Sequence, residues 1–493
     1  MSTRPGILRF ALLAVLTAPG LALFGQDDTA YRAWQEKEQE KFQQFKDKND
    51  RDFYEFLKHE WRGVQLLKGD LRDPIPDPPT LPVYTPSKDQ PKPAPAPSPT
   101  VTVVPFKEAA PVPVPPPAAA PLPESASIEF YGADLSVSLP ASLRIPLKGN
   151  PDKESISEYF AAMAAAPYDR VLKSAGEIRA ARRLNDWGYT LLLASMGEKL
   201  HGPNTNEKVL FTWFMLLKSG FETKVGFSGE SVVLLLRVDG RLFAVPFFSF
   251  DKGGRYYAVS LEPKSPVEIT QLYAYEGDFP GATTPMRFRV PELPLLSNTT
   301  ATKTLHFTYG RTDYSVPVTY SRDAVRFFEY YPQTEFEVYF DGSISPGAAS
   351  SLYNAFAPML KGKSEVEAVN ILLRFSQTAF GYKVDKEIFG REKPMFPDEV
   401  LYYNDSNCKD RAILFAYLVR TLTRLDVVGL DFPGHISTAV RFTNEIPGDR
   451  VQVHGQRYTI CDPTFINADA GMCMPQFKGV SPTIIPLRRP SPS

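Results

Sequence analysis

The first clear pattern in the chain is a pair of large apolar residues that recurs every eleven positions over residues 29–67. The pairs are Tyr31/Trp34, Phe42/Phe45, Phe53/Phe56 and Val64/Leu67, separated mostly by Glu, Lys, Gln and Asp. An eleven-residue period keeps a stripe nearly straight along a helix, so an amphipathic helical segment is predicted over residues 26–72. The seam packs on the protein's own body or a second copy, or lies on a membrane surface. Mixed charge on its polar face argues against anionic lipid.

Apolar positions become sparse over residues 73–124, where 19 of the 47 prolines lie. Such a segment cannot bury a core, and it favours extended polyproline structure. We therefore expect a Pro-rich linker that acts as a spacer between the helix and the body, with partner binding to its proline motifs as the alternative.

The first 25 residues combine two arginines with a short apolar stretch that a proline and a glycine interrupt, followed by polar residues. This order is typical of a secretory signal peptide, and the stretch is too short for a spanning helix. We expect an exported protein, periplasmic or extracellular, with no membrane span after cleavage. An uncleaved anchor is the alternative.

Two later regions repeat one order of apolar helix and strands. Residues 209–214 are similar to 413–418, residues 224–227 to 427–430, and residues 240–246 to 456–462. We infer that residues 125–262 are a degenerate copy of a domain at 346–493, chance similarity being the alternative. The copy places Asn204 at the position of Cys408, Glu230 near that of His435, and Val245 or Pro246 near that of Asp462. Short alternating stretches between turn signals predict a β-rich, sandwich-like domain at 263–345.

The candidate chemistry lies between residues 404 and 465. Cys408 precedes an apolar helical pattern, with Ser406 or Asn407 as N-cap. At the start of a helix, unpaired backbone N–H groups stabilise a thiolate, which is the reactive form of cysteine.

His435 opens an alternating strand over residues 435–442, and a second strand over residues 456–461 ends at Asp462. If the two strands pair antiparallel, the carboxylate of Asp462 lies beside the imidazole of His435. The imidazole then stands between a thiol and an orienting acid, as nucleophilic catalysis by cysteine requires.

These residues resemble the transglutaminase-like superfamily of papain-type cysteine enzymes. The matching stretches are 408–412 (Cys-Lys-Asp-Arg-Ala), 434–435 (Gly-His) and 461–464 (Cys-Asp-Pro-Thr), with 375–382 and 389–394 upstream. The resemblance implies that Cys408 is the nucleophile, His435 the general base and Asp462 the orienting acid. Gln377, on the preceding helix, is a candidate oxyanion donor. The implied fold is α+β, with a transglutaminase-like domain at 346–493.

Composition narrows the alternatives. A formal net charge of −1 gives no field that selects nucleic acid. Three cysteines without a C-x-x-C pair exclude a disulfide scaffold and a cysteine-based zinc site. Five histidines show no metal-ligand spacing, and no glycine loop suits a phosphate, so we predict no metal and no cofactor. Cys461 and Cys473 are interpreted as structural, and His454 as a solvated turn residue.

Two functions remain open. The first is an exported cysteine enzyme that acts on amide bonds of proteins or peptidoglycan peptides, as a peptidase, an amidase or an acyl transferase. The second is a non-catalytic envelope scaffold that uses the transglutaminase-like folds as interaction modules, with a partner bound through the N-terminal helix.

Overall fold

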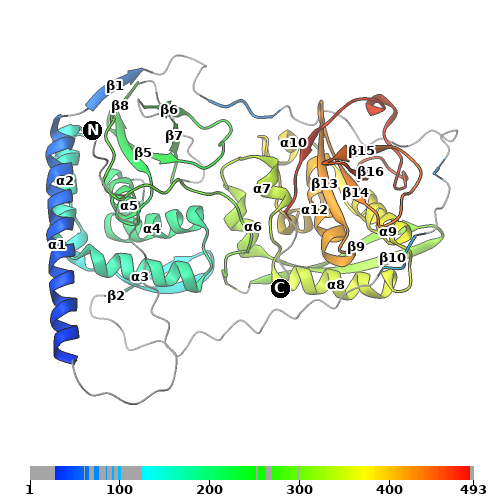
Figure 1. The fold of residues 1–493 in the computed structure, drawn as a ribbon, viewed down its shortest axis with the longest axis horizontal. Helices are drawn as coiled ribbons and strands as arrows, with labels where there is room; N and C mark the ends of the chain where they lie inside the picture. The colour runs from blue at the N-terminus through cyan, green and yellow to red at the C-terminus, as the bar shows by residue number, and fades with distance from the viewer. Residues whose placement is uncertain are drawn as a thin grey trace, which may run out of the picture. The chain divides into compact units, whose positions relative to one another are not determined.

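The computed structural model describes residues 28–59, 61–65, 72–76, 85, 92–93, 98–101, 125–203, 205–250, 254–262, 269, 271–297 and 299–488. It is a mixed α+β protein, as the sequence predicts (Figure 1). Residues 1–50 and residues 51–493 form two compact units. The predicted signal peptide lies outside the described residues.

The predicted amphipathic segment is a helix only in part. Helix α1 covers Asp28–His59, and the chain then enters strand β1, Trp61–Gln65. The eleven-residue pattern continues past the end of the helix, but β1 instead pairs antiparallel with a strand of the body. Phe53 is buried and packs edge-on against Phe160, Tyr275 and Phe279. Phe53 and strand β1 are therefore part of the body itself. They do not belong to a separate helix that a linker attaches to the body.

The first half of the body contains a six-stranded antiparallel sheet of order β1-β8-β4-β5-β7-β6. Its strands after β1 are β4 (Thr223–Ser228), β5 (Ser231–Arg237), β6 (Phe247–Ser249), β7 (Arg255–Val259) and β8 (Gln271–Tyr275). Before them come the hairpin β2 (Ser125–Phe130) and β3 (Ala133–Ser138), then α2 (Lys153–Ala165), α3 (Tyr168–Ala181), α4 (Asp186–His201) and α5 (Asn206–Lys218). Helix α5 packs against β4 and β5.

The middle region corrects the predicted sandwich at 263–345. Strand β8 belongs to the first sheet, and the other two strands form one hairpin, β9 (Thr300–Tyr309) and β10 (Thr312–Ser321). Its buried face carries Leu305, Phe307, Val316 and Val318. Among the described residues this face is covered by helices rather than a second sheet. These helices are α8 (Pro346–Leu360) on β10 and α9 (Glu365–Thr378) on β9. Helices α6 (Arg322–Glu329) and α7 (Phe336–Phe340) follow the hairpin.

The last part of the chain contains a five-stranded sheet of order β15-β16-β14-β13-β17. Its strands are β13 (Asp426–Phe432), β14 (His435–Arg441), β15 (Arg450–Val453), β16 (Gln456–Cys461) and β17 (Thr483–Ile485). Helix α12 (Cys408–Leu422) packs against β13 and β14. Before it lie β11 (Gly381–Tyr382), α10 (Asp385–Phe389), α11 (Pro397–Tyr402) and β12 (Asp405–Ser406). Read from β17, the order matches that of the first sheet without β1, and every neighbouring pair is antiparallel in both.

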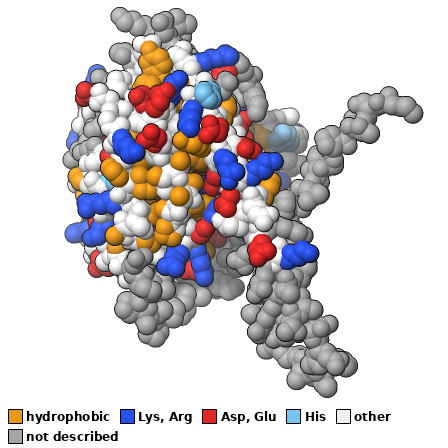
Figure 2. Space-filling model, turned by 90° about the vertical axis from the view of Figure 1, so that its left-hand side faces the viewer, with side chains coloured by type: hydrophobic (Ala, Val, Ile, Leu, Met, Phe, Trp, Pro, Cys, Tyr) orange, Lys and Arg blue, Asp and Glu red, His pale blue; other side chains and the backbone are white. Residues whose placement is uncertain are grey.

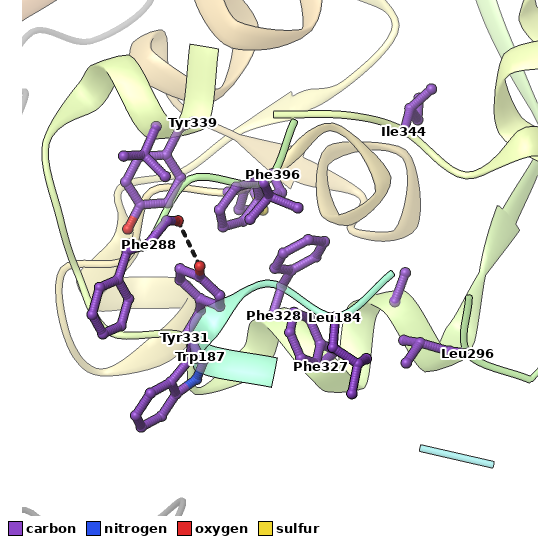
Figure 3. Close-up of a cluster of buried hydrophobic side chains, with 14 of the residues drawn as sticks. Leu184, Trp187, Phe288, Leu296, Phe327, Phe328, Tyr331, Tyr339, Ile344 and Phe396 are labelled. Atoms are coloured by element: carbon purple, nitrogen blue, oxygen red, sulfur yellow. Dashed lines mark hydrogen bonds between the residues drawn. The ribbon is translucent and has the colours of Figure 1, made fainter. Parts of the chain in front are cut away.

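One aromatic core connects the two halves of the body. Figure 3 shows Phe396 of the second half close to Phe328, with Tyr331 and Trp187 nearby. The rings of Phe328 and Phe396 stack at 3.9 Å, and Trp187 stacks on Phe288 at 5.6 Å. The Tyr331 hydroxyl donates to the Phe288 carbonyl at 2.6 Å. Buried aromatic pairs of this kind explain why residues 51–493 cohere as one unit.

Several described residues of the predicted Pro-rich spacer contact the body. Asp73 accepts from the Tyr257 hydroxyl at 3.0 Å and pairs with Arg255 at 2.5 Å. Farther along, the Pro99 carbonyl accepts from Glu365 N at 2.8 Å, and Val101 N donates to the Lys363 carbonyl at 2.8 Å. These contacts join residue 73 and residues 99–101 to the body, so the described part of the segment is more than a spacer.

Acidic and basic side chains are interspersed on the face shown in Figure 2, with no continuous field of one sign. This fits the formal net charge of −1. Among the described residues, no helix combines the length and the apolar character needed to cross a membrane.

Candidate active site

Helix α12 begins at Cys408, as the sequence predicts, with Asn407 as its N-cap residue. The carboxylate of Asp410, in the first turn, accepts from Asn407 N at 3.0 Å and so satisfies one unpaired donor of the helix start. The Cys408 sulfur accepts from Ile436 N at 3.5 Å. This contact joins the start of the helix to the start of strand β14.

His435 and Asp462 meet at the end of the sheet where β14 begins and β16 ends. The two strands pair antiparallel with Thr438 opposite Cys461, as predicted. His435 Nε2 lies 2.8 Å from Asp462 Oδ2. The second carboxylate oxygen, Oδ1, accepts from Thr464 N at 2.8 Å and from Phe465 N at 3.2 Å, which fixes the orientation of the acid.

The His435 imidazole makes a hydrogen bond to Asp462 at its edge and has a stacked aromatic ring on its face. Phe477, in the short 3-10 helix η2 (Pro475–Phe477), stacks on the His435 ring at 5.2 Å with an interplanar angle of 6°. The other ring nitrogen, Nδ1, is buried and makes no hydrogen bond of normal geometry. Burial lowers the pKa of His435, but the Asp462 carboxylate and the Cys408 sulfur together outweigh burial and raise it to about 10. The protonated ring is therefore favoured between the carboxylate and the sulfur.

The three groups are almost fully enclosed. The exposed fractions of Cys408, His435 and Asp462 are 0%, 1% and 2%. Tyr382, which is only half-buried, pairs in register with Ser406 through strands β11 and β12, close to the start of α12. Its pKa is raised first by burial and then by the Cys408 sulfur. The sulfur is therefore closed off from solvent, and Tyr382 is a half-exposed group that interacts with it.

Gln377 does not have the predicted role. Its side-chain amide donates to the carbonyls of Asp462, Phe465 and Ala468 at 2.8–3.0 Å. Its carbonyl oxygen accepts from Arg374 at 2.9 Å and from Asn467 N at 3.2 Å. An amide has only two hydrogens, and both are engaged inside the loop that follows Asp462. Gln377 holds this loop in place and is not an oxyanion donor.

The other sulfur atoms lie in apolar surroundings. Cys461 is fully buried, and burial raises the pKa of its thiol. Cys473 is buried beside Phe477 and Met474 in the core of the sheet, and burial raises its pKa to about 12. All three cysteines are free. His454 is exposed in the β15–β16 turn with a φ of 49°.

The first sheet shows which residues occupy the equivalent positions there. The β4–β5 hairpin pairs Ser228 with Ser231, as β13–β14 pairs Phe432 with His435, so Ser231 takes the histidine position. Leu234 lies opposite Val259, as Thr438 lies opposite Cys461, so Ser260 takes the position of Asp462.

Asn206, the first residue of α5, takes the position of Cys408. Its Oδ1 accepts from Val232 N at 2.8 Å, and Val232 corresponds to Ile436. The predicted alignment is thus corrected at the positions of Cys408 and Asp462, whereas Glu230 does lie near the histidine position, as predicted. Asn204 lies outside the described residues, Glu230 is one residue early, and residues 240–246 form no strand.

Sequence reasoning found the three central residues but missed Phe477 and Tyr382. No local sequence pattern identifies Phe477. It lies beyond the loop that follows Asp462, and only the tertiary fold brings it against the His435 ring. No family model matches this chain, and no curated protein or solved structure is similar to it.

Proposed function

We propose that the second half of the body is a cysteine enzyme of the transglutaminase-like kind that acts on amide bonds. The observation that carries the proposal is the contact of 2.8 Å between His435 and Asp462 beside a sulfur at the start of α12. Two ordinary strands and a helix do not need this trio of side chains to fold, because the first sheet does without it.

In the first step the Cys408 thiolate attacks the carbonyl carbon of the substrate amide. A carbon–sulfur bond forms, and the carbonyl electron pair moves to the oxygen, which the backbone N–H of Cys408 is suited to stabilise. The electron pair then returns, the carbon–nitrogen bond breaks, and the amine leaves with the proton that His435 received from the thiol. The product is a thioester. Water resolves it by hydrolysis, and an amine resolves it by transfer.

The wider assignment rests on the same resemblance. The shared strand order of the two sheets supports a duplicated transglutaminase-like domain whose first copy has lost its reactive groups. The signal-like N-terminus supports export to a periplasmic or extracellular location, where proteins and peptidoglycan peptides are natural amide substrates.

A second function is favoured by one observation, the complete burial of the Cys408 sulfur. A buried free cysteine also packs simply as a small apolar residue. In this alternative both domains bind an envelope partner and neither carries out chemistry.

Iodoacetamide labelling at about pH 6.5, read by mass spectrometry for each cysteine, distinguishes the two functions. The enzyme predicts that Cys408 reacts fastest, that His435→Ala removes this advantage, and that an amide-directed electrophile labels wild type but not Cys408→Ala. Equal, slow reaction of Cys408, Cys461 and Cys473 in the folded protein would support the binding module instead.

A further inference from the structure

A fully buried carboxylate binds the residues on both sides of Cys408. Asp385 is the first residue of α10, 23 positions before the cysteine in the sequence. Its Oδ1 accepts from Asn407 Nδ2 at 2.5 Å, and its Oδ2 lies 2.6 Å from Lys409 Nζ. Oδ2 also accepts from Lys393 N at 2.7 Å. One side chain therefore connects the N-cap of the nucleophile helix with the residue directly after the nucleophile.

The charges in this contact are expensive to bury. The side chains of Asp385 and Lys409 are 0% and 2% exposed. Taking such a pair out of water costs as much as its attraction returns, and an apolar pair of the same volume is often at least as stable. The ion pair is thus poorly explained by stability alone. What it provides is a fixed position for the backbone that carries the sulfur.

The first sheet lacks this arrangement. There Thr205, the residue before Asn206, uses its own hydroxyl to cap Lys208 N at 3.1 Å. Glu207, the residue after it, accepts from Leu147 N at 3.1 Å and is only partly buried. Among the described residues, no single side chain is recorded as bonding to both. Within the part of the chain that the structure describes, the double contact is therefore found beside Cys408 and not beside Asn206.

We propose that Asp385 is a positioning residue for Cys408. It holds Asn407 and Lys409 so that the sulfur stays beside His435, and this proposal rests on the function proposed above. Asp385 does not reach the reacting atoms itself. It acts through the two neighbours of the nucleophile.

The test compares Asp385→Asn with Asp398→Asn. Asp398 is a matched control, because it is also fully buried, lies in the same half, and accepts three hydrogen bonds, from Ser345 N, Ser345 Oγ and Ser321 N. We expect Asp385→Asn to slow iodoacetamide labelling of Cys408 by about 10- to 100-fold at about pH 6.5, since small misplacements of a reactive group cost this much. Asp398→Asn should leave the labelling rate of the folded protein within about twofold of wild type, although it also lowers the melting temperature.

A second variant separates position from stability. Asp385→Asn leaves the ammonium of Lys409 buried with a weakened partner, whereas Asp385→Asn with Lys409→Met removes both charges. We expect the double variant to regain melting temperature while Cys408 stays slow to label. Labelling of Cys408 in the double variant should also begin to accelerate at a higher pH than in Asp398→Asn. The other charged and titratable groups that face the sulfur, His435, Tyr382 and Arg411, are unchanged in these variants, and Lys409 is changed only in the double variant.

The outcomes are distinct. If reactivity recovers together with melting temperature, or if both single variants slow labelling equally, Asp385 is only structural and the inference is overturned while the proposed function stands. If Cys408 of the wild type reacts no faster than Cys461 and Cys473, the proposed function fails, and Asp385 has no nucleophile to position.

Discussion

Helices α5 and α12 each run into an antiparallel hairpin that a two-residue turn closes, and the same strands then follow in the same order. At the three positions where the second repeat holds Cys408, His435 and Asp462, the first repeat holds Asn206, Ser231 and Ser260. The backbone contacts at two of these positions are nevertheless alike. Asn206 Oδ1 accepts from Val232 N where the sulfur accepts from Ile436 N. Ser260 Oγ accepts from Glu262 N where Asp462 Oδ1 accepts from Thr464 N.

The comparison separates two tasks of Cys408 and Asp462: accepting a backbone hydrogen bond, and taking part in the proposed chemistry. The first task is local, because a buried backbone N–H at a helix–strand junction or after a strand needs an acceptor. Asn and Ser perform it as well as Cys and Asp do. The second task belongs to the function proposed above: His435, oriented by Asp462, exchanges a proton with the Cys408 sulfur, and the first sheet has no thiol, imidazole or carboxylate at these positions. The helix and the sheet therefore form both with and without a thiol, an imidazole and a carboxylate at these three positions.

The strongest test of this comparison copies the first repeat into the second. The double variant His435→Ser/Asp462→Ser should remain folded, since the equivalent hairpin folds with serines. Cys408 labelling at about pH 6.5 should fall by about 10²-fold or more, which is the usual contribution of a positioned base. Circular dichroism confirms folding, and peptide mapping measures the rate.

Ser231→Ala in the first repeat is the control for that variant and should not alter Cys408 labelling. If the double variant labels as fast as wild type, the helix start alone activates the sulfur. The two repeats would then differ only in the presence of a thiol.

The next effect concerns stability against pH. The folded pKa of His435 is raised to about 10, above its unfolded value of about 6.5. A raised pKa contributes stability that is full below about pH 6.5 and is lost as the pH rises through about 10. Asp462→Asn keeps the acceptor for Thr464 N but removes the charge that raises this pKa. The free energy of unfolding of wild type should exceed that of Asp462→Asn by a few kcal/mol near pH 6, since each pKa unit is worth about 1.4 kcal/mol.

This gap between wild type and Asp462→Asn should narrow steadily toward pH 10, as urea unfolding at several pH values would measure. Ser260→Ala, at the equivalent position, carries no titrating contact and should shift stability by an amount that does not depend on pH. A gap that stays constant for Asp462→Asn would show that the acid does not hold a proton on His435.

The sequence predicted the helix that begins at Cys408 and both strands, because these depend on local patterns, and it predicted the meeting of His435 with Asp462 on the condition of antiparallel pairing. A helix start and a period of two place these residues, and an antiparallel pairing brings the strand ends together. The burial of Cys408, His435 and Asp462 could not be predicted, because it depends on tertiary packing that no local sequence pattern marks. Asp385 was missed for the same reason.

The errors in the predicted fold arose where a sequence pattern continued although the secondary structure or its packing changed. The eleven-residue period extends to Leu67, although edge pairing with β8 turns Trp61–Gln65 into a strand. The alternating stretches near residue 310 suit a sandwich, but the apolar face of the β9–β10 hairpin is covered by α8 and α9. The match of residues 240–246 to 456–462 failed because it followed residue similarity, whereas the register places Ser260 at the position of Asp462. Pairing geometry, rather than residue similarity, aligns the two repeats.

The smallest expected effect comes from placing a thiol in the first repeat, as Asn206→Cys in a Cys408→Ala background. The amide of Asn206 accepts from Val232 N and donates to the Glu230 carbonyl, both at 2.8 Å. A thiol can accept from Val232 N as Cys408 accepts from Ile436 N, but it is a weak donor to Glu230. Asn206→Cys should therefore lose about 0.5–1 kcal/mol, less than Asn206→Ala, which loses both bonds.

Because position 231 offers a hydroxyl and no imidazole, the thiol of the Asn206→Cys variant should label at about pH 6.5 as slowly as an ordinary half-exposed thiol. Its rate should rise about tenfold per pH unit until the thiol itself ionises, whereas Cys408 of the wild type should already be reactive at low pH. Labelling as fast as that of Cys408 would mean that a helix start and one backbone donor are sufficient for reactivity. The difference between the two repeats would then lie in the sulfur, and His435 with Asp462 would be part of the packing of the sheet.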